Sequence, residues 1–343
     1  MNHLNIAPIA TPNKRGIITK SIKKAAFYLN KGEVVAIPTE TVYGLAARID
    51  NENALKKIFE VKQRPIFNPL IVHISCLESL DKVAKKVPEK AKLLAQHFWP
   101  GPLTMVFEKS NMVSKIVTSD KNTVAVRMPN HPMALELIKT VGVPLAAPSA
   151  NPFGSISPTT AKHVEKYFKD KLNVILDGGM AENGIESTII GFKKDEVVVY
   201  RLGSVSLEML ETVVGSVKVV KSSEKKIIVP GMLERHYAPK TPMILSNDPL
   251  KTAYNLIGKN IALLYFKEQP IFSDYYTEIL STTGDFNEAA KNLYAAMHKL
   301  DSSGFDLLIA EKFPDKGLGK SINDRLIRAC KRETNLTPNN IFI

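Results

Sequence analysis

The chain has 343 residues, of which 44% are hydrophobic and 23% are charged, which is ordinary for a soluble globular protein of two domains. Its net charge is +12. Residues 1–215 contribute +8, from 28 basic and 20 acidic residues, and residues 216–343 contribute +4, from 18 basic and 14 acidic residues. Because the charge is spread over both parts, no dense basic tract marks a dedicated nucleic-acid surface, although a polyanionic substrate is compatible with it.

The sequence also argues against a membrane span, a leader peptide and a structural zinc site. No apolar run approaches the roughly 18 residues that a membrane helix needs. Cys76 and Cys330 lie far apart, and no Cys-x-x-Cys or His-x-x-x-His spacing occurs. We therefore expect a cytoplasmic protein in a reducing compartment.

Hydrophobic periodicity predicts helices and strands that alternate at first, whereas adjoining strands follow later. The predicted helices cover residues 22–29, 53–61, 88–98 and 132–140. The predicted strands cover residues 34–37, 70–72, 103–107, 123–127, 145–147 and 174–176, and a hairpin joins 187–191 to 197–201. This order predicts an α/β domain over residues 1–215, with one twisted mixed sheet, parallel and antiparallel, and flanking helices.

The composition changes after residue 215. A polar stretch with several prolines predicts an extended linker over residues 216–241. Strands at 261–265 and 307–309, with a helix at 286–300 capped by Asp285, predict a small Rossmann-like open α/β domain over residues 242–343.

Gly317-Leu318-Gly319-Lys320-Ser321 follows a strand and precedes a helix, as a phosphate-binding loop would. That motif needs a glycine at position 314, where this chain has proline, which lacks the N–H that would join a phosphate cradle. We therefore expect a glycine-shaped turn here.

Lys62 and Arg64 stand directly before Pro65, which ends the preceding helix. Two cations on a stiffened loop suit an anion such as a phosphate or a carboxylate, and we expect both on a surface loop. The alternative is a solvated charge pair at a helix end.

Further polar groups follow the ends of other predicted strands, where ligands bind in open α/β sheets. These segments are residues 39–43, 62–73, 123–127 and 149–157, and Ser187 with Arg201. Three of these segments have a structural alternative: a salt bridge for Arg127, a core position for His73 and plain turn chemistry for 148–152. No Ser-His-Asp order or nucleophilic cysteine is evident, so the cleft is expected to hold anions rather than form covalent intermediates.

Several motifs resemble the signature of YrdC-like threonylcarbamoyl-AMP synthases over about residues 17–215. They are residues 38–45 (PTETVYGL), 62–65 (KQRP), 68–70 (NPL), 99–104 (WPGPLT), 126–129 (VRMP) and 147–151 (APSAN). Pro230-Gly231-Met232, His236-Tyr237-Ala238-Pro239 and residues 317–326 resemble the linker and the C-terminal domain of the longer members.

The resemblance implies a nucleotidyltransferase that joins L-threonine, bicarbonate and ATP into threonylcarbamoyl-AMP and releases pyrophosphate. The product serves a tRNA threonylcarbamoyltransferase complex, which modifies tRNA beside the anticodon. Magnesium is expected on the ATP phosphates, with no protein ligand assigned.

The resemblance also implies roles for individual residues. The expected threonine-binding residues are Thr41, His73, Arg127, Ala147 and Ser187. The expected ATP-binding residues are Arg64, Asn68, Thr123, Ser149, Ser157, Arg201 and Tyr237, with the linker covering the active site. Lys62, Arg64, Ser149 and Asn151 are expected to serve phosphate neutralisation and site geometry in catalysis.

Two other functions remain open from the sequence. One is a module that binds tRNA or double-stranded RNA without chemistry of its own, which the basic charge favours. The other is a carbamoyltransferase with the same nucleotide loops and a different amine pocket. Transient tRNA contact is compatible with either the synthase or the RNA-binding module.

Overall fold

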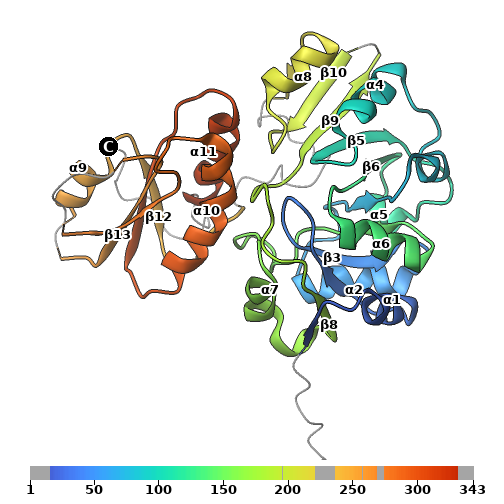
Figure 1. Ribbon diagram of the computed structural model, residues 1–343, viewed down its shortest axis with the longest axis horizontal. Helices are drawn as coiled ribbons and strands as arrows, with labels where there is room; N and C mark the ends of the chain where they lie inside the picture. The colour runs from blue at the N-terminus through green and yellow to red at the C-terminus, as the bar shows by residue number, and fades with distance from the viewer. Residues whose placement is uncertain (1–15, 195, 221–235, 257, 269–273, 331–343) are drawn as a thin grey trace, which may run out of the picture.

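The computed structural model describes residues 16–194, 196–220, 236–256, 258–268 and 274–330. The part of the predicted linker at 221–235 lies outside the described residues. The described chain forms two α/β units, each built on its own sheet (Figure 1).

The first unit contains an eleven-stranded mixed sheet, as the sequence predicts. The strand order is β1-β8-β2-β3-β7-β4-β6-β5-β9-β10-β11, with parallel and antiparallel neighbours. The strands are β1 (Ile17–Thr19), β2 (Val35–Ile37), β3 (Gly44–Arg48), β4 (Ile71–His73), β5 (Leu103–Glu108), β6 (Thr123–Arg127), β7 (Leu145–Ala146), β8 (Val174–Leu176), β9 (Thr188–Lys193), β10 (Glu196–Arg201) and β11 (Lys218–Val219). The β9–β10 hairpin is antiparallel, as expected, and β11 extends the sheet into the segment predicted as linker.

Helix boundaries follow from local capping chemistry. The helices of this unit are α1 (Ile22–Asn30), α2 (Glu52–Lys62), α3 (Leu80–Val83), α4 (Glu89–Phe98), α5 (Lys115–Thr118), α6 (Pro132–Val141), α7 (Ala161–Phe168) and α8 (Leu207–Val214). The Asn51 side chain accepts a hydrogen bond from the Ala54 N–H at the start of α2, and Gln63 ends that helix in the left-handed conformation. The expected helix end before Pro65 is therefore confirmed.

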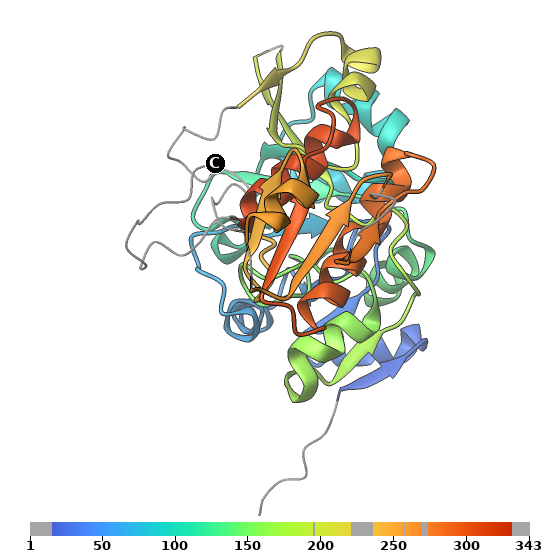
Figure 2. The ribbon, with the colours of Figure 1, turned by 90° about the vertical axis from the view of Figure 1, so that its left-hand side faces the viewer.

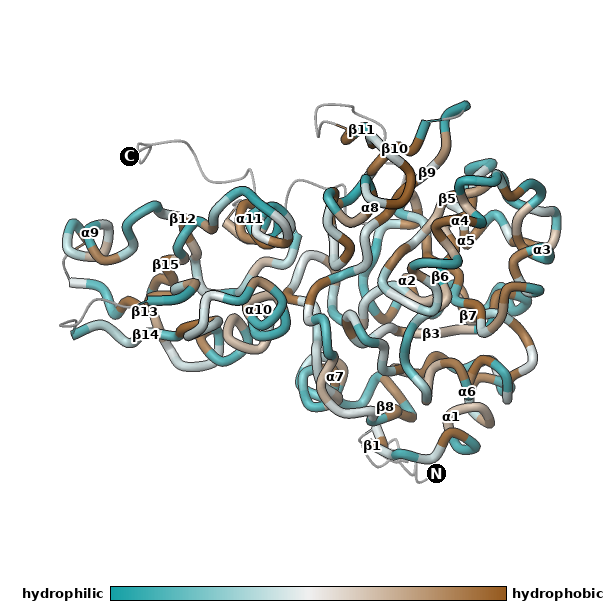
Figure 3. Tube along the Cα trace, turned by 45° about the horizontal axis from the view of Figure 1, so that its top comes forward, coloured by the Kyte–Doolittle hydropathy of each residue, from teal (hydrophilic) through white to brown (hydrophobic). Residues whose placement is uncertain are grey.

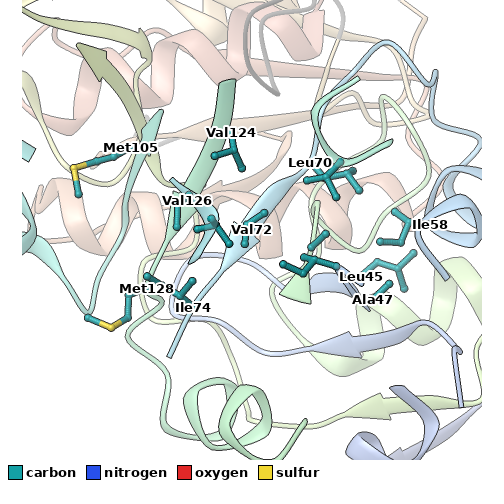
Figure 4. Packing of buried hydrophobic residues seen from close by; sticks show 14 of the residues in the cluster. Leu45, Ala47, Ile58, Leu70, Val72, Ile74, Met105, Val124, Val126 and Met128 are labelled. Carbon is teal, nitrogen blue, oxygen red and sulfur yellow. The ribbon is translucent and has the colours of Figure 1, made fainter. Parts of the chain in front are cut away.

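Hydrophobic side chains cover both faces of the first sheet because neighbouring residues of a strand point to opposite sides. On one face, Leu45, Leu70 and Val72 pack with Ile58 of α2 (Figure 4). On the other face, strand residues pack against α1 and α6. Figure 3 shows hydrophobic stretches along strands such as β10 and β15. Because both faces of the sheet are covered, the polar groups of its strands can meet a ligand only at the strand ends.

The second unit has a four-stranded parallel sheet in the order β12-β15-β13-β14. Its strands are β12 (Met243–Ser246), β13 (Ile261–Tyr265), β14 (Tyr276–Ile279) and β15 (Leu307–Glu311), and its helices are α9 (Pro249–Tyr254), α10 (Phe286–Asp301) and α11 (Leu318–Cys330). The parallel order and the Asp285 cap of α10 confirm the predicted Rossmann-like architecture.

Helices α10 and α11 stand on the side of the second unit that faces the first (Figures 1 and 2). Their apolar residues share one core cluster with Val42, Ile156 and Ile185 of the first unit. The two units therefore pack against each other rather than merely being tethered.

The glycine-rich segment before α11 is a turn. A Cβ atom on Gly319 would lie 2.1 Å from the Pro314 carbonyl oxygen, and the Gly319 N–H donates to the Lys316 carbonyl at 2.9 Å. The turn itself explains the glycine, as the sequence predicts. Among the described helices, none has the length and apolarity to cross a membrane.

Candidate active site

A cleft opens where the strand ends of the first unit meet the linker residues His236 and Tyr237. It is lined by Thr39, Thr41, Val42, Gly44, Arg64, Ile71, His73, Arg127, Ala147, Pro148, Ser149, Glu186, Ser187, Arg201, His236 and Tyr237.

The structure brings most of the residues predicted for the site together in this cleft. Those lining it are Thr41, Arg64, His73, Arg127, Ala147, Ser149, Ser187, Arg201 and Tyr237; those that do not are Lys62, Asn68, Thr123, Asn151 and Ser157. Thr123 begins β6 and Arg127 ends it, so about 13 Å of strand separates them. The predicted roles of all these residues remain predictions.

Lys62 does not lie on a surface loop, so that expectation is wrong. It is the last residue of α2, its side chain is fully buried, and its ammonium group donates to the carbonyl oxygens of Ser149 and Asn151. Burial, followed by the charge of Arg64, lowers the pKa of Lys62 well below its ordinary value. The side chain holds the 149–151 loop in place.

Arg64 is also buried, although its side chain lines the cleft. Its Nε donates to the Asn68 carbonyl at 3.1 Å and its Nη2 to the Pro69 carbonyl at 2.8 Å. Burial and the neighbouring positive charge of Arg201 lower the pKa of Arg64 to about 9. Two buried cations that destabilise each other form a site that an anion would stabilise.

Arg127 forms a buried salt bridge, which is the structural alternative named for it above, and its side chain also lines the cleft. Its Nη2 lies 2.7 Å from a carboxylate oxygen of Glu40, in a pair that is nearly inaccessible to solvent. Its Nη1 donates to Thr41 Oγ1 at 2.9 Å, and its Nε donates to the Gly101 carbonyl at 3.2 Å. Glu40 and two oxygen acceptors thus fix the orientation of the guanidinium.

His73 is buried at the end of β4, next to Arg127 in the parallel register. Burial, and then the charge of Arg127, lower the pKa of His73 to about 3, so the ring is neutral near pH 7. Its Nδ1 lies 3.2 Å from the Ile71 carbonyl. A neutral imidazole in this position can exchange hydrogen bonds with a ligand but adds no charge.

Ser187 and Arg201 meet at the start of β9 and the end of β10. Arg201 donates from Nε and Nη2 to the Ser187 carbonyl at 3.1 and 2.7 Å, and the Ser187 hydroxyl lies 2.7 Å from that of Thr104. The hairpin therefore carries both groups to the same wall of the cleft.

Sequence reasoning missed Glu186 and gave His236 no role. Glu186 is the one carboxylate among the described residues that line the cleft, and it stands between Ile185 and Ser187. Polar residues flank it in the sequence, among them Asn183 and Thr188, so no local pattern marks it as a buried acid. His236 is buried among cations, and its Nδ1 has no hydrogen-bond partner within the described structure.

Two protein-family models match consecutive parts of the chain. The family model of the Sua5, YciO and YrdC proteins, described as "Telomere recombination", matches residues 28–203. A second model, "Threonylcarbamoyl-AMP synthase, C-terminal domain", matches residues 205–330.

Similar proteins cover nearly the whole chain. A threonylcarbamoyl-AMP synthase of Pyrococcus abyssi is 42% identical over 319 residues, or 90% of this chain and 93% of that protein. One of Bacillus subtilis is 41% identical over 320 residues, or 90% and 92% of the two chains. The crystal structure of P. abyssi Sua5 complexed with L-threonine matches with a TM-score of 0.85 and 38% identity, covering 92% of this chain and 96% of that one. The chain thus belongs to the threonylcarbamoyl-AMP synthase family, in its two-domain form.

Proposed function

We propose that the cleft is the active site in which L-threonine, bicarbonate and ATP meet. The chain is a nucleotidyltransferase that forms threonylcarbamoyl-AMP and pyrophosphate for the threonylcarbamoyladenosine modification of tRNA. The convergence of Arg64, Arg127 and Arg201 on one cleft carries the assignment of the site, because all three substrates bear oxyanions.

The threonine end of the cleft comprises Thr41, His73, Arg127, Ala147 and Ser187. Arg127 pairs with the substrate carboxylate, and Glu40 and the Gly101 carbonyl hold its guanidinium ready for that contact. The neutral His73 ring and the Ser187 hydroxyl are the groups suited to the substrate hydroxyl and amine. The P. abyssi protein has been solved in complex with L-threonine, which supports L-threonine as a substrate of this chain.

The residues assigned to ATP are Arg64, Ser149, Arg201 and Tyr237, which line the cleft, and Asn68, Thr123 and Ser157, which do not line it. Two observations support this assignment. After burial, the positive charge of Arg201 lowers the pKa of Arg64, and a bound phosphate would offset that repulsion. Asn68 is fully buried, and neither its side-chain amide nor its oxygen has a hydrogen-bond partner within the described residues, which a nucleotide would supply.

The chemistry needs positioning and charge neutralisation. The threonine amine adds to CO2 with loss of a proton, or to bicarbonate with loss of water, to give a carbamate. The carbamate oxygen then attacks the α-phosphorus of ATP, and pyrophosphate departs. The arginines stabilise the charge that develops on the phosphate oxygens, and the fixed loops hold the reacting groups in line. Lys62 and Asn151 contribute by holding the 149–151 loop, since Asn151 also donates to the Pro152 and Ser155 carbonyls.

We propose that Mg²⁺ enters with the ATP phosphates. Within the described residues, no group of three or more His, Cys, Asp or Glu side chains lies together. The carboxylate of the cleft, Glu186, accepts hydrogen bonds from Ser157 and Tyr294 and pairs with Arg325. Its oxygens are therefore already engaged, and a single engaged carboxylate does not fit a dedicated magnesium site.

We further propose that the product passes in the cytoplasm to the tRNA threonylcarbamoyltransferase complex, with at most transient contact between this chain and tRNA. The spread of basic charge over the whole chain supports weak electrostatic contact rather than a dedicated RNA surface.

Pyrophosphate release from ATP and bicarbonate, measured with a panel of amino acids, tests the function. We expect release that requires L-threonine, with threonylcarbamoyl-AMP as the coupled product. Release that is independent of the amino acid, or that needs another amine, would refute the proposal.

A further inference from the structure

Glu186 is a buried carboxylate at the junction of the two units. It follows Ile185 in the loop before β9 and directly precedes Ser187. Its Oε1 accepts a hydrogen bond from the Ser157 hydroxyl at 2.6 Å, and its Oε2 accepts one from the Tyr294 hydroxyl at 2.9 Å. The Nε of Arg325 lies 3.2 Å from Oε2.

These partners come from both units of the fold. Ser157 belongs to the first unit, whereas Tyr294 lies on α10 and Arg325 on α11. Burial, and then the charge of Glu186, raise the pKa of Tyr294 well above its ordinary value, so the hydroxyl keeps the proton that it donates. Arg325 is completely buried.

A buried carboxylate is stable only when charged and hydrogen-bonding partners surround it. Of the three donors, the first unit supplies one neutral hydroxyl, and α10 and α11 supply the other hydroxyl and the positive charge. Removing Arg325 would take the ion pair away from Glu186 and leave the charge of Arg201, on the first unit, as its positive neighbour. The carboxylate would then move towards the water of the cleft.

Such a movement would reach both ends of the cleft. Glu186 is bonded covalently to Ser187, and its own carbonyl accepts the Ser204 N–H at 3.0 Å. Ser321 of α11 donates to the neighbouring Gly203 carbonyl at 2.8 Å, so α11 contacts both the loop before β9 and the adjoining loop after β10. The Arg325 guanidinium also lies 5.5 Å from the centre of the Tyr237 ring.

We propose that Glu186, Tyr294 and Arg325 form a positioning cluster through which the second unit of the fold sets the geometry of the active site. In this cluster Arg325 and Tyr294 fix the Glu186 carboxylate. Glu186 in turn fixes Ser187 on the threonine side and Ser157 on the nucleotide side. The inference rests on the proposed function, because it assigns these contacts to the substrates of that reaction. It gives the C-terminal domain a role in substrate binding besides its packing.

Helix α11 offers a matched pair of variants. Arg325 pairs with the buried Glu186, whereas Lys320, on the same helix, pairs at 2.8 Å with Glu208 of α8 in an exposed ion pair between the same two units. The test compares Arg325→Met, Arg325→Lys and Tyr294→Phe with the control Lys320→Met in the full chain. Melting temperature and circular dichroism establish the folded fraction of each variant.

For Arg325→Met and Tyr294→Phe we expect kcat/KM per folded molecule to fall about 10-fold or more, because small displacements of positioned groups cost about that much or more. We expect Arg325→Lys to recover part of the loss, because it returns the charge, and Lys320→Met to stay within about twofold of the wild type. Calorimetric titration with L-threonine should show a weaker Kd for Arg325→Met, independently of turnover.

The opposite results are equally clear. If Arg325→Met and Tyr294→Phe lower the melting temperature but keep the wild-type kcat, KM and threonine Kd per folded molecule, the contacts serve only the packing of the domains and the inference is wrong. If the wild type releases no pyrophosphate with threonine, the proposed function fails instead. The Kd values of the variants for L-threonine and ATP, compared with those of the wild type, then still decide whether the positioning cluster acts on ligand binding.

Discussion

Replacing Lys62 by methionine separates a structural role from a phosphate-binding role. Methionine keeps the apolar stem up to Cε but removes the ammonium group that donates to the Ser149 and Asn151 carbonyls. Both carbonyls would lose this buried donor, at about 1–3 kcal/mol each. Relief from burying the ammonium offsets part of that loss.

We therefore expect Lys62→Met to lower the free energy of unfolding by about 2–5 kcal/mol. For a unit of about 200 residues, at about 2–4 °C per kcal/mol, that corresponds to a fall in melting temperature of roughly 4–20 °C. Urea unfolding followed by tryptophan fluorescence measures the change directly, because Trp99 is buried in the core of the same unit. Arg64→Met provides the comparison, since its side chain lines the cleft.

Kinetics of the folded protein complete the test. If Lys62 acts through the 149–151 loop, the loss of activity accompanies the loss of stability, and ligands that stabilise the fold recover part of both. A Lys62→Met variant with the stability of the wild type and no adenylate formation would refute this reasoning and return Lys62 to the phosphate.

Four further outcomes are expected. Valine should release pyrophosphate much more slowly than serine, because a site that bonds the substrate hydroxyl rejects a ligand lacking it; comparable turnover of valine and threonine would contradict the pocket. Arg127→Lys should raise the KM for threonine about 10-fold or more and leave the KM for ATP nearly unchanged, because lysine lacks the planar guanidinium that pairs with a carboxylate. An equal rise in both KM values would argue against a carboxylate contact. Gly319→Ala should lower the melting temperature through the clash with the Pro314 carbonyl but leave the KM for ATP unaltered; a selective rise in that KM would favour a phosphate loop. Burial lowers the pKa of His163 to about 4 and that of His298 to about 3, whereas the ordinary value is 6.5. Between these values the unfolded chain binds more protons than the folded one, so the free energy of unfolding should fall as the pH drops from about 6.5 towards 4. Replacing both histidines by glutamine should flatten that pH dependence, as measured by urea titrations at several pH values.

The sequence predicts the elements of the fold well where local chemistry decides them. Pro65 and Pro132 mark the end and the start of helices, and short apolar runs between turns become strands such as β8. The mixed sheet follows from the changing order of helices and strands. The order of strands within that sheet could not be predicted, because it depends on pairing between distant segments.

The site could be predicted in part for the same reason. Arg127 and Arg201 end strands, so their place at the cleft follows from periodicity. The contacts of Lys62 and Glu186 depend on groups more than 80 residues away, in one case in the other domain. A charge in a sequence shows that a partner is needed, but it does not show which distant oxygen or guanidinium will be that partner.

The place of β8 in the first sheet bears on how the chain folds as it is made. Ile17 pairs with Val174, and β8 separates β1 from β2 although it is synthesised long after both. At the usual pace of translation, this interval lasts roughly 10–30 s. During that time β2 has an unpaired edge, and an extended edge of this kind attracts other chains. Nascent chains that stop before β8 should therefore depend on chaperones, and a ribosome stalled in α7 would be a source of aggregation.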